Sequence, residues 1–179
     1  MKTEKAYKLL KINKNGQLFP LYVLANKETP VGEWIPAESG ELQANGKVKA
    51  KLGDGLCYRP GWHLAEVPFA DWIGERQADG TLARRKDNVW CEVEYPTDID
   101  YNPEAFENGK RTTKKGETNV ESRRFLRHIP ENGYYNYRTQ AAADVWIITG
   151  AIKITKVLTD DEVAEICRAK GIEPQEVAK

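Results

Sequence analysis

The strongest constraint on the fold is the run of apolar, largely β-branched residues at 145–156, which is typical of a strand inside a sheet. A second strand is expected at 88–95, where Val89 and the alternate residues after it share one face. Turn-forming residues at 13–16 predict a hairpin over 7–24, with Pro20 marking an edge or a bulge in its second strand. These three segments predict a sheet that contains 145–156 as a central strand.

Two helices complete the expected fold. Thr159 and Glu162 have the spacing of a capping box, so a helix is predicted at 159–170 that ends before Gly171. Pro68 favours the start of a short helix at 68–73. The polar segment 96–132 has little apolar periodicity and is expected to be a flexible insertion.

We therefore predict one α+β domain spanning residues 1–179. Its expected architecture is a twisted, mainly antiparallel sheet with short helices and a capped C-terminal helix. A chain of 179 residues is long enough to bury a core without disulfides or a structural metal.

The amino-acid composition restricts the classes of partner that the protein is expected to bind. The formal net charge of zero argues against binding long nucleic acid by phosphate neutralisation. The three cysteines are odd in number and far apart, which indicates a reducing compartment, and no apolar run approaches 20 residues. A cytoplasmic protein without a membrane partner is expected. Walker A, GxGxxG, HExxH and zinc-binding patterns do not occur in the sequence, so we expect neither a cofactor nor a metal.

Two clusters of aromatic residues each contain an arginine. The first cluster is 58–63, with the sequence Tyr-Arg-Pro-Gly-Trp-His around a Pro-Gly turn, and the second cluster is 133–139, with the sequence Gly-Tyr-Tyr-Asn-Tyr-Arg-Thr. Aromatic rings stack on planar ligands and guanidinium groups bind phosphate, so together the clusters predict a pocket for a planar anion. The predicted ligand-binding residues are Tyr58, Arg59, Trp62, His63, Tyr135, Tyr137 and Arg138.

A structural interpretation competes with this one. The first cluster could instead plug one end of the sheet, with the guanidinium of Arg59 stacked on a ring. If the second cluster is a strand, Tyr135 and Tyr137 point to one side and Arg138 to the other, so only one subset faces a single pocket.

Catalytic alternatives depend on few residues. His63 and His128 are the two histidines of the chain, and as base and acid they could cleave a phosphodiester, His63 being the catalytic candidate. Glu92 and Glu94 share a strand face and form a possible carboxylate pair, although exposed carboxylates of this kind are common on sheets. The basic patch 123–127 would suit a phosphate or an acidic partner.

Three segments resemble a domain of unknown function from phages and mobile elements. They are the Tyr-Arg-Pro-Gly-Trp-His-Leu segment at 58–64, the second cluster, and the Trp-Ile-Ile-Thr-Gly-Ala-Ile-Lys segment at 146–153. The domain occurs as a small phage protein and as a module in large polyvalent proteins of gut phages. The resemblance covers most of 7–172, and 86–129 is the least similar part. It implies a role inside a bacterial host, against host defences.

A fainter likeness is to ADP-ribosyltransferases. The segment 61–66, followed by Phe69 and Ala70, is similar to their passage from strand to helix. Those enzymes position NAD with an aromatic residue or a histidine and act through a glutamate late in the fold. The chain has no matching glutamate after Trp146, so this activity lacks one of its parts.

The functional prediction is therefore a phage or mobile-element accessory module that binds a nucleotide-like small anion. Sequestration of a host signalling nucleotide would need no catalytic residue. One alternative is a nucleotide-processing enzyme, a phosphodiesterase or an ADP-ribosyltransferase, which differs by releasing product. The other is a module that binds a host protein through 96–132 or the basic patch.

Overall fold

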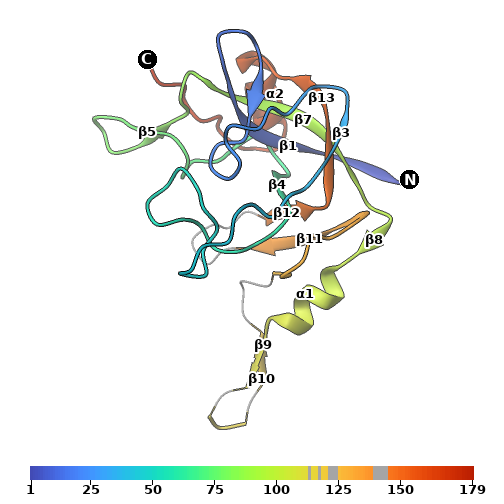
Figure 1. The fold of residues 1–179 in the computed structure, drawn as a ribbon. Coiled ribbons are helices and arrows are strands. Elements are labelled where there is room, and N and C mark those ends of the chain that lie inside the picture. The colour runs from blue at the N-terminus through green and yellow to red at the C-terminus, as the bar shows by residue number, and fades with distance from the viewer. Residues whose placement is uncertain (113, 117, 121–124, 139–144) are drawn as a thin grey trace.

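The computed structural model describes residues 1–112, 114–116, 118–120, 125–138 and 145–179, which form an α+β domain (Figure 1). Its strands are β1 (Thr3–Ile12), β2 (Leu18–Phe19), β3 (Trp34–Pro36), β4 (Trp62–Ala65), β5 (Glu75–Arg76), β6 (Leu82–Ala83), β7 (Asn88–Pro96), β8 (Ile99–Asp100), β9 (Lys110–Thr112), β10 (Thr118–Val120), β11 (Gly133–Arg138), β12 (Val145–Thr149) and β13 (Ala151–Val157). Its helices are α1 (Asn102–Asn108) and α2 (Asp160–Ala169).

One mixed, mostly antiparallel sheet organises the domain. Its strand order is β3-β13-β7-β1-β4-β12-β11-β8, with β2 paired to β1, and the short β8–β11 pair is parallel. The longest pairing joins β1 to β7 from Thr3 opposite Pro96 to Lys11 opposite Asn88. The predicted hairpin forms only in part, at β1 and β2. Its second strand ends at Phe19, before Pro20, which cannot donate a ladder hydrogen bond, and residues 20–24, expected in that strand, are outside it.

The predicted strand at 145–156 is two strands, so the single-strand prediction is wrong. The chain turns at Gly150, and β12 and β13 join different halves of the sheet. A Cβ atom at Gly150 would lie 2.4 Å from the carbonyl oxygen of Pro130, which leaves room for glycine alone. The close contact explains why an otherwise continuous strand pattern is interrupted at this residue.

The sheet curls so that its two halves enclose a common core. Tyr95 of β7 and Tyr134 of β11 meet edge to face, with ring centroids 5.8 Å apart, although β1, β4 and β12 separate their strands in the sheet order. The core between the halves contains Ala6, Leu10, Leu18, Leu64, Cys91, Val93, Tyr95, Ile147, Ile152 and Ile154. The alternation predicted for 88–95 is confirmed, because Trp90 lies in a second cluster on the opposite face.

Helix α2 covers that second cluster. The Thr159 side chain accepts a hydrogen bond from the backbone N–H of Glu162 at 3.2 Å, which confirms the predicted N-cap. Val163 and Cys167 are buried in the same cluster as Trp90. The helix is followed by Gly171 in the left-handed conformation, as the sequence predicts.

The prediction of a helix at 68–73 is wrong. Phe69 donates its N–H to the carbonyl of Val67, and Ile73 donates to that of Ala70, which are bonds of short turns. Six residues are too few to offset the cost of helix nucleation unless packing favours the helix. Here Phe69, Ala70 and Ile73 pack against the second cluster as a turn.

The segment 96–132 contains regular structure that the sequence pattern did not indicate. Strand β8, helix α1 and the β9–β10 hairpin lie within it, and the hairpin projects away from the sheet (Figure 1). Residues 113, 117 and 121–124 of this segment lie outside the described part, so the expectation of a flexible insertion stays a prediction. Neither described helix is both long and apolar enough to span a membrane.

Candidate functional site

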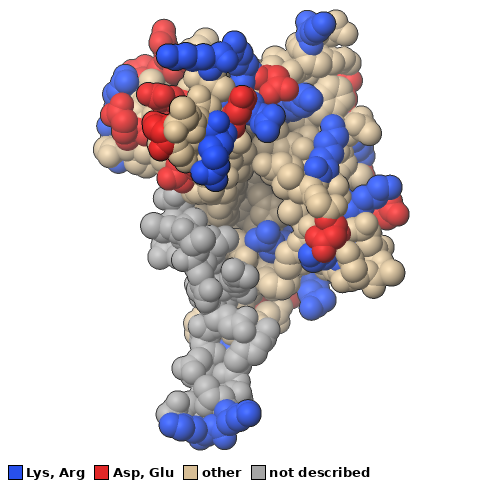
Figure 2. All heavy atoms as spheres, turned by 90° about the vertical axis from the view of Figure 1, so that its left-hand side faces the viewer, with Lys and Arg blue, Asp and Glu red and all other residues tan. Residues whose placement is uncertain are grey.

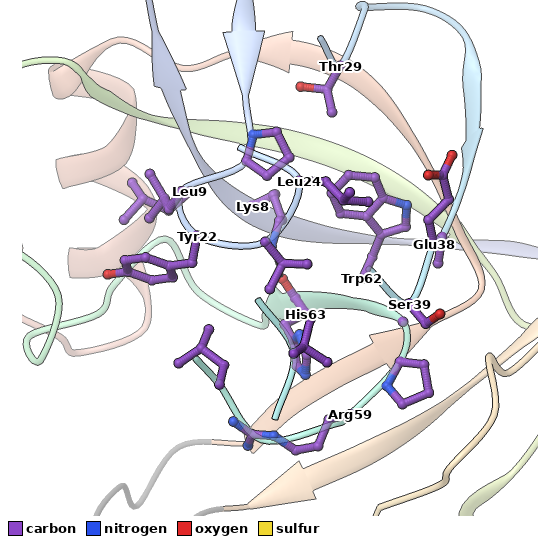
Figure 3. A pocket seen from close by; sticks show the side chains of 18 of the residues that line it. Lys8, Leu9, Tyr22, Leu24, Thr29, Glu38, Ser39, Arg59, Trp62 and His63 are labelled. Carbon is purple, nitrogen blue, oxygen red and sulfur yellow. Dashed lines mark hydrogen bonds between the residues drawn. The ribbon is translucent and has the colours of Figure 1, made fainter. Parts of the chain in front are cut away.

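The main cavity opens where strands β1 and β4 separate. These strands pair at Tyr7 and Ala65, and the chain then contributes Lys8 and Leu9 from one strand and His63 from the other to a cavity of about 480 Å³ (Figure 3). Loop segments within 20–29, 35–39 and 48–61 supply its other walls. Seen from the left-hand side of Figure 1, the molecule is hollowed, and both basic and acidic side chains lie around the hollow (Figure 2).

The Pro-Gly turn of the first cluster rests directly on β12. Gly61 has φ +131°, and a Cβ atom there would lie 2.5 Å from Cγ2 of Ile148 and 3.1 Å from the carbonyl oxygen of Thr149. Only glycine fits this approach without displacing the sheet. The turn thereby positions Arg59 just before β4 and Trp62 as the first residue of β4, and both side chains line the cavity.

The indole ring of Trp62 is held in place by a hydrogen bond and by packing. Its Nε1–H donates to the carbonyl oxygen of Ile35 at 3.0 Å, and its ring packs against the core between the two halves of the sheet. A tryptophan held by both a hydrogen bond and packing loses little further freedom when a ligand stacks on it.

Lys8 is an unexpected member of the site. Its Nζ donates to the carbonyl oxygen of His63 at 2.8 Å and lies 5.6 Å from the centre of the Trp62 ring. Burial lowers the pKa of Lys8 to about 8, because an ammonium loses hydration in an apolar setting. Lys8 lies two residues from Ala6 and from Leu10, so it shares a strand face with these two core residues. A lysine on an otherwise apolar strand face is the signal that sequence reasoning missed.

Arg59 and His63 add two polar groups without partners. The guanidinium carbon of Arg59 lies 4.8 Å from the centre of the Tyr137 ring, a cation–π contact. Nε of Arg59 and Nε2 of His63 are buried and have no hydrogen-bond partner in the described structure. Burial, and then the charges of Lys8 and Arg59, lower the pKa of His63 to about 3, so its imidazole is neutral at physiological pH.

Two carboxylates, those of Glu28 and Glu38, line the cavity, and each has a partner in the structure. Glu38 pairs with Lys27, and Glu28 accepts a hydrogen bond from Gln17 at 3.1 Å. Within the described residues no carboxylate forms an ion pair with Lys8 or Arg59. Lys8 and Arg59 therefore line the cavity as cationic side chains that no described carboxylate pairs with.

Aromatic rings form the wall next to Arg59. Tyr137 of β11 is directly opposite Trp146 of β12, so both side chains lie on the same face of the sheet. Trp146 meets Trp72 edge to face, with centroids 5.5 Å apart, and Trp72 remains 38% exposed. Trp72 and Trp146 were not among the predicted ligand residues, because only the tertiary structure brings 72 and 146 together.

The structure divides the predicted site residues. Arg59, Trp62, His63 and Tyr137 line the main cavity. Tyr58 lies instead at a smaller hollow, which Ser39, Tyr101, Arg127, His128, Ile129 and Glu131 also line. The side chain of Arg138 is outside the part of the chain that the structure describes.

Tyr135 is buried in a structural role and does not reach the cavity. It has no exposed surface, and its hydroxyl accepts a hydrogen bond from the backbone N–H of Leu126 at 3.2 Å. Burial is the main cause that raises its pKa to about 12. Tyr135 and Tyr137 share a sheet face, as predicted, and both are buried in the same cluster. They differ in that the ring of Tyr137 contacts the guanidinium of Arg59 and its side chain lines the cavity.

The catalytic pairs considered from the sequence are not assembled in the main cavity. Nε2 of His128 binds Glu104 at 2.7 Å and Nδ1 contacts the carbonyl of Ile129 at 3.0 Å, at the smaller hollow. Glu92 pairs with Lys5 and, like Glu94, does not line the cavity. In the described residues no cluster of three or more His, Cys, Asp and Glu side chains could hold a metal.

Arg123 and Arg124 of the basic patch lie outside the described residues. Arg127, the last residue of that patch, is exposed and lines the smaller hollow. None of the described residues of the patch, 125–127, lines the cavity that contains Arg59 and His63.

A scan against family models finds no match, and searches of curated proteins and of solved structures find none either. The likenesses to the phage domain and to ADP-ribosyltransferases stay predictions from sequence.

Proposed function

We propose that the protein binds a small, planar, nucleotide-like anion in the cavity between β1 and β4. The observation that carries this proposal is the pair of buried nitrogens without partners, Nε of Arg59 and Nε2 of His63, beside the uncompensated charge of Lys8. Buried polar groups normally have partners, and groups left without one often mark a functional site. An anion would supply the missing acceptor and the missing negative charge.

The rest of the lining suits a planar body attached to that anion. The volume of about 480 Å³ falls in the range of small-molecule sites. Trp62, Trp72 and Trp146 offer rings at its walls, and stacking on such rings contributes about 1–3 kcal/mol per base in nucleic-acid complexes. Arg59 can fork onto a phosphate from beside those rings.

Sequestration fits these groups better than turnover. A general base is most effective when its pKa is near the working pH, and a buried His63 with a pKa of about 3 is a weak base and is not protonated to act as an acid. Binding needs only the geometry and the charge. In the phage setting implied by the Tyr-Arg-Pro-Gly-Trp-His segment, the bound anion is a host signalling nucleotide and the protein acts in the host cytoplasm.

Calorimetric titration with AMP, NAD, ADP-ribose and cyclic dinucleotides tests the proposal, with adenosine as the ligand that lacks charge. We expect at least one anion to bind and adenosine to bind at least tenfold more weakly, a difference of about 1.4 kcal/mol. Arg59→Gln should lower the affinity for the anion by about tenfold to a hundredfold, because hydrogen bonds to charged groups contribute about 1.5–3 kcal/mol.

Arg168→Gln is the matched control, since Arg168 is exposed on α2 and does not line the cavity. Equal losses in the two variants, or no binding by any anion of the panel, would refute the proposal. Mass spectrometry of the recovered ligand separates sequestration from the enzymatic alternatives, which predict product.

A further inference from the structure

Lys8 has the surroundings of a reactive amine. It lines the cavity and donates to one neutral acceptor, the carbonyl oxygen of His63, while no described carboxylate pairs with it. A neutral amine has two N–H groups and one lone pair, so a bond to that carbonyl leaves the lone pair and one N–H for the cavity. Nucleophilic lysines are activated by apolar surroundings, and the Trp62 ring, whose centre lies 5.6 Å from Nζ of Lys8, is part of such surroundings.

Lys5 shows what is particular to Lys8. Both are on β1, but the side chain of Lys5 is 66% exposed and pairs with Glu92 at 3.2 Å. Lys5 is thus an exposed lysine already engaged with a carboxylate, whereas no described carboxylate pairs with Lys8. The burial that lowers the pKa of Lys8 to about 8 makes about half of its side chains neutral at pH 8. An ordinary lysine with a pKa near 10.4 is then about 0.4% neutral.

We propose that Lys8 is a nucleophile and that the cavity takes a planar aldehyde carrying an anionic group, which Lys8 binds as an imine. The lone pair of Nζ attacks the carbonyl carbon and forms a C–N bond. In the addition step the carbonyl π bond breaks and the oxygen takes one proton from Nζ. In the elimination step the oxygen takes the second proton of Nζ, the remaining C–O bond breaks, and the oxygen leaves as water. The C=N bond then remains, and no oxidant or reductant is consumed.

This inference rests on the proposed function, because Arg59 must hold the anionic group for the aldehyde to reach Lys8. The geometry separates the two tasks: Arg59 stands against Tyr137, while Lys8 lies against Trp62 at the start of the gap between β1 and β4. His63 lies between the two cations as a neutral imidazole and can accept or donate a hydrogen bond to the bound molecule.

Pyridoxal 5′-phosphate is the probe for the test, since it is a planar aldehyde with a phosphate. The protein is incubated at pH 8 with less than one equivalent, reduced with borohydride and mapped by peptide mass spectrometry. We expect Lys8 to be labelled at least about tenfold faster than Lys5, given the larger neutral fraction. Pyridoxal, which lacks the phosphate, should lose most of this preference.

Variants provide the matched controls. Lys8→Arg keeps the charge and should abolish the preferred label, while Lys5→Arg should leave it unchanged. Arg59→Gln should slow labelling by pyridoxal 5′-phosphate and leave labelling by pyridoxal unaltered. If Lys8→Arg does not fold, labelling of the wild-type protein in the presence of excess pyridoxine 5′-phosphate, which has an alcohol in place of the aldehyde, decides the same point by protection of Lys8.

The outcomes separate the two proposals. Preferred, protectable labelling of Lys8 supports both. Binding of pyridoxine 5′-phosphate without preferred labelling overturns the nucleophile and leaves the anion site standing. Uniform labelling of exposed lysines with no binding of the alcohol overturns the nucleophile, and failure of the nucleotide panel as well would remove the anion site.

Discussion

The ammonium group of Lys8 donates a hydrogen bond to the backbone carbonyl of His63, 2.8 Å away, across the place where β1 and β4 stop pairing. The side chain of Lys8 thus supplies the hydrogen bond that a backbone N–H of β1 would otherwise donate. The carbonyl of His63 therefore has a partner although the two strands are apart at this point. The gap that results is the cavity, and it brings a lysine, a histidine and an arginine together in an apolar setting.

Acid should destabilise the protein through His63. Its folded pKa of about 3 lies below the unfolded value near 6.5, so between these values the unfolded state binds the proton and stability falls as pH falls. The slope is at most about 1.4 kcal/mol per pH unit. His63→Asn should flatten the dependence of urea unfolding between pH 6.5 and 4. An unchanged slope would contradict burial of a neutral imidazole.

His128 should show the opposite dependence. Its hydrogen bond to Glu104 is the main cause that raises its pKa, so its stabilising contribution is fully present below pH 6.5 and is lost as pH rises through the folded pKa. His128→Gln should therefore lower the melting temperature more at pH 6 than at pH 8. Glu104→Gln should reproduce this difference, and an equal loss at both pH values would argue against the ion pair.

Gly61→Ala should destabilise the fold by about 2 kcal/mol or more. The added Cβ would meet Ile148 at 2.5 Å in a backbone conformation that L-residues rarely adopt. Gly80→Ala is the matched control, since its φ is also positive but no heavy atom lies within 4 Å of the added Cβ. Chemical denaturation should give the control a cost of about 1 kcal/mol from the left-handed backbone alone, and equal costs would mean that β12 yields to the turn.

Tyr135 and Tyr137 should separate stability from binding. Tyr135→Phe removes the hydroxyl that accepts from Leu126 and should cost about 1 kcal/mol of stability with ligand affinity unchanged. Tyr137→Leu removes the ring beneath Arg59 and should weaken ligand binding by about threefold to tenfold. Thermal melts and calorimetric titration of both variants decide the point, and a binding defect in Tyr135→Phe would reverse the assignment.

Local patterns predicted local structure well. The alternation around Val89 and Trp90 depends only on strand geometry, and both side chains lie on the expected faces. The cap at Thr159 involves residues three apart, and it forms as predicted. The prediction of a helix at 68–73 was wrong because the packing of Phe69 and Ile73 favours a turn over a short helix.

The sequence by itself determined the strands β1 and β7, the turn after β1, the capped helix and the arginine-aromatic character of two clusters. Tertiary structure alone decided that the strand pattern bends at Gly150, that Tyr135 is covered, and that Lys8 joins His63 and Arg59. The physical reason is that side-chain alternation is a property of neighbouring residues. Curling of the sheet and separation of β1 from β4 depend instead on pairings between residues far apart in the chain.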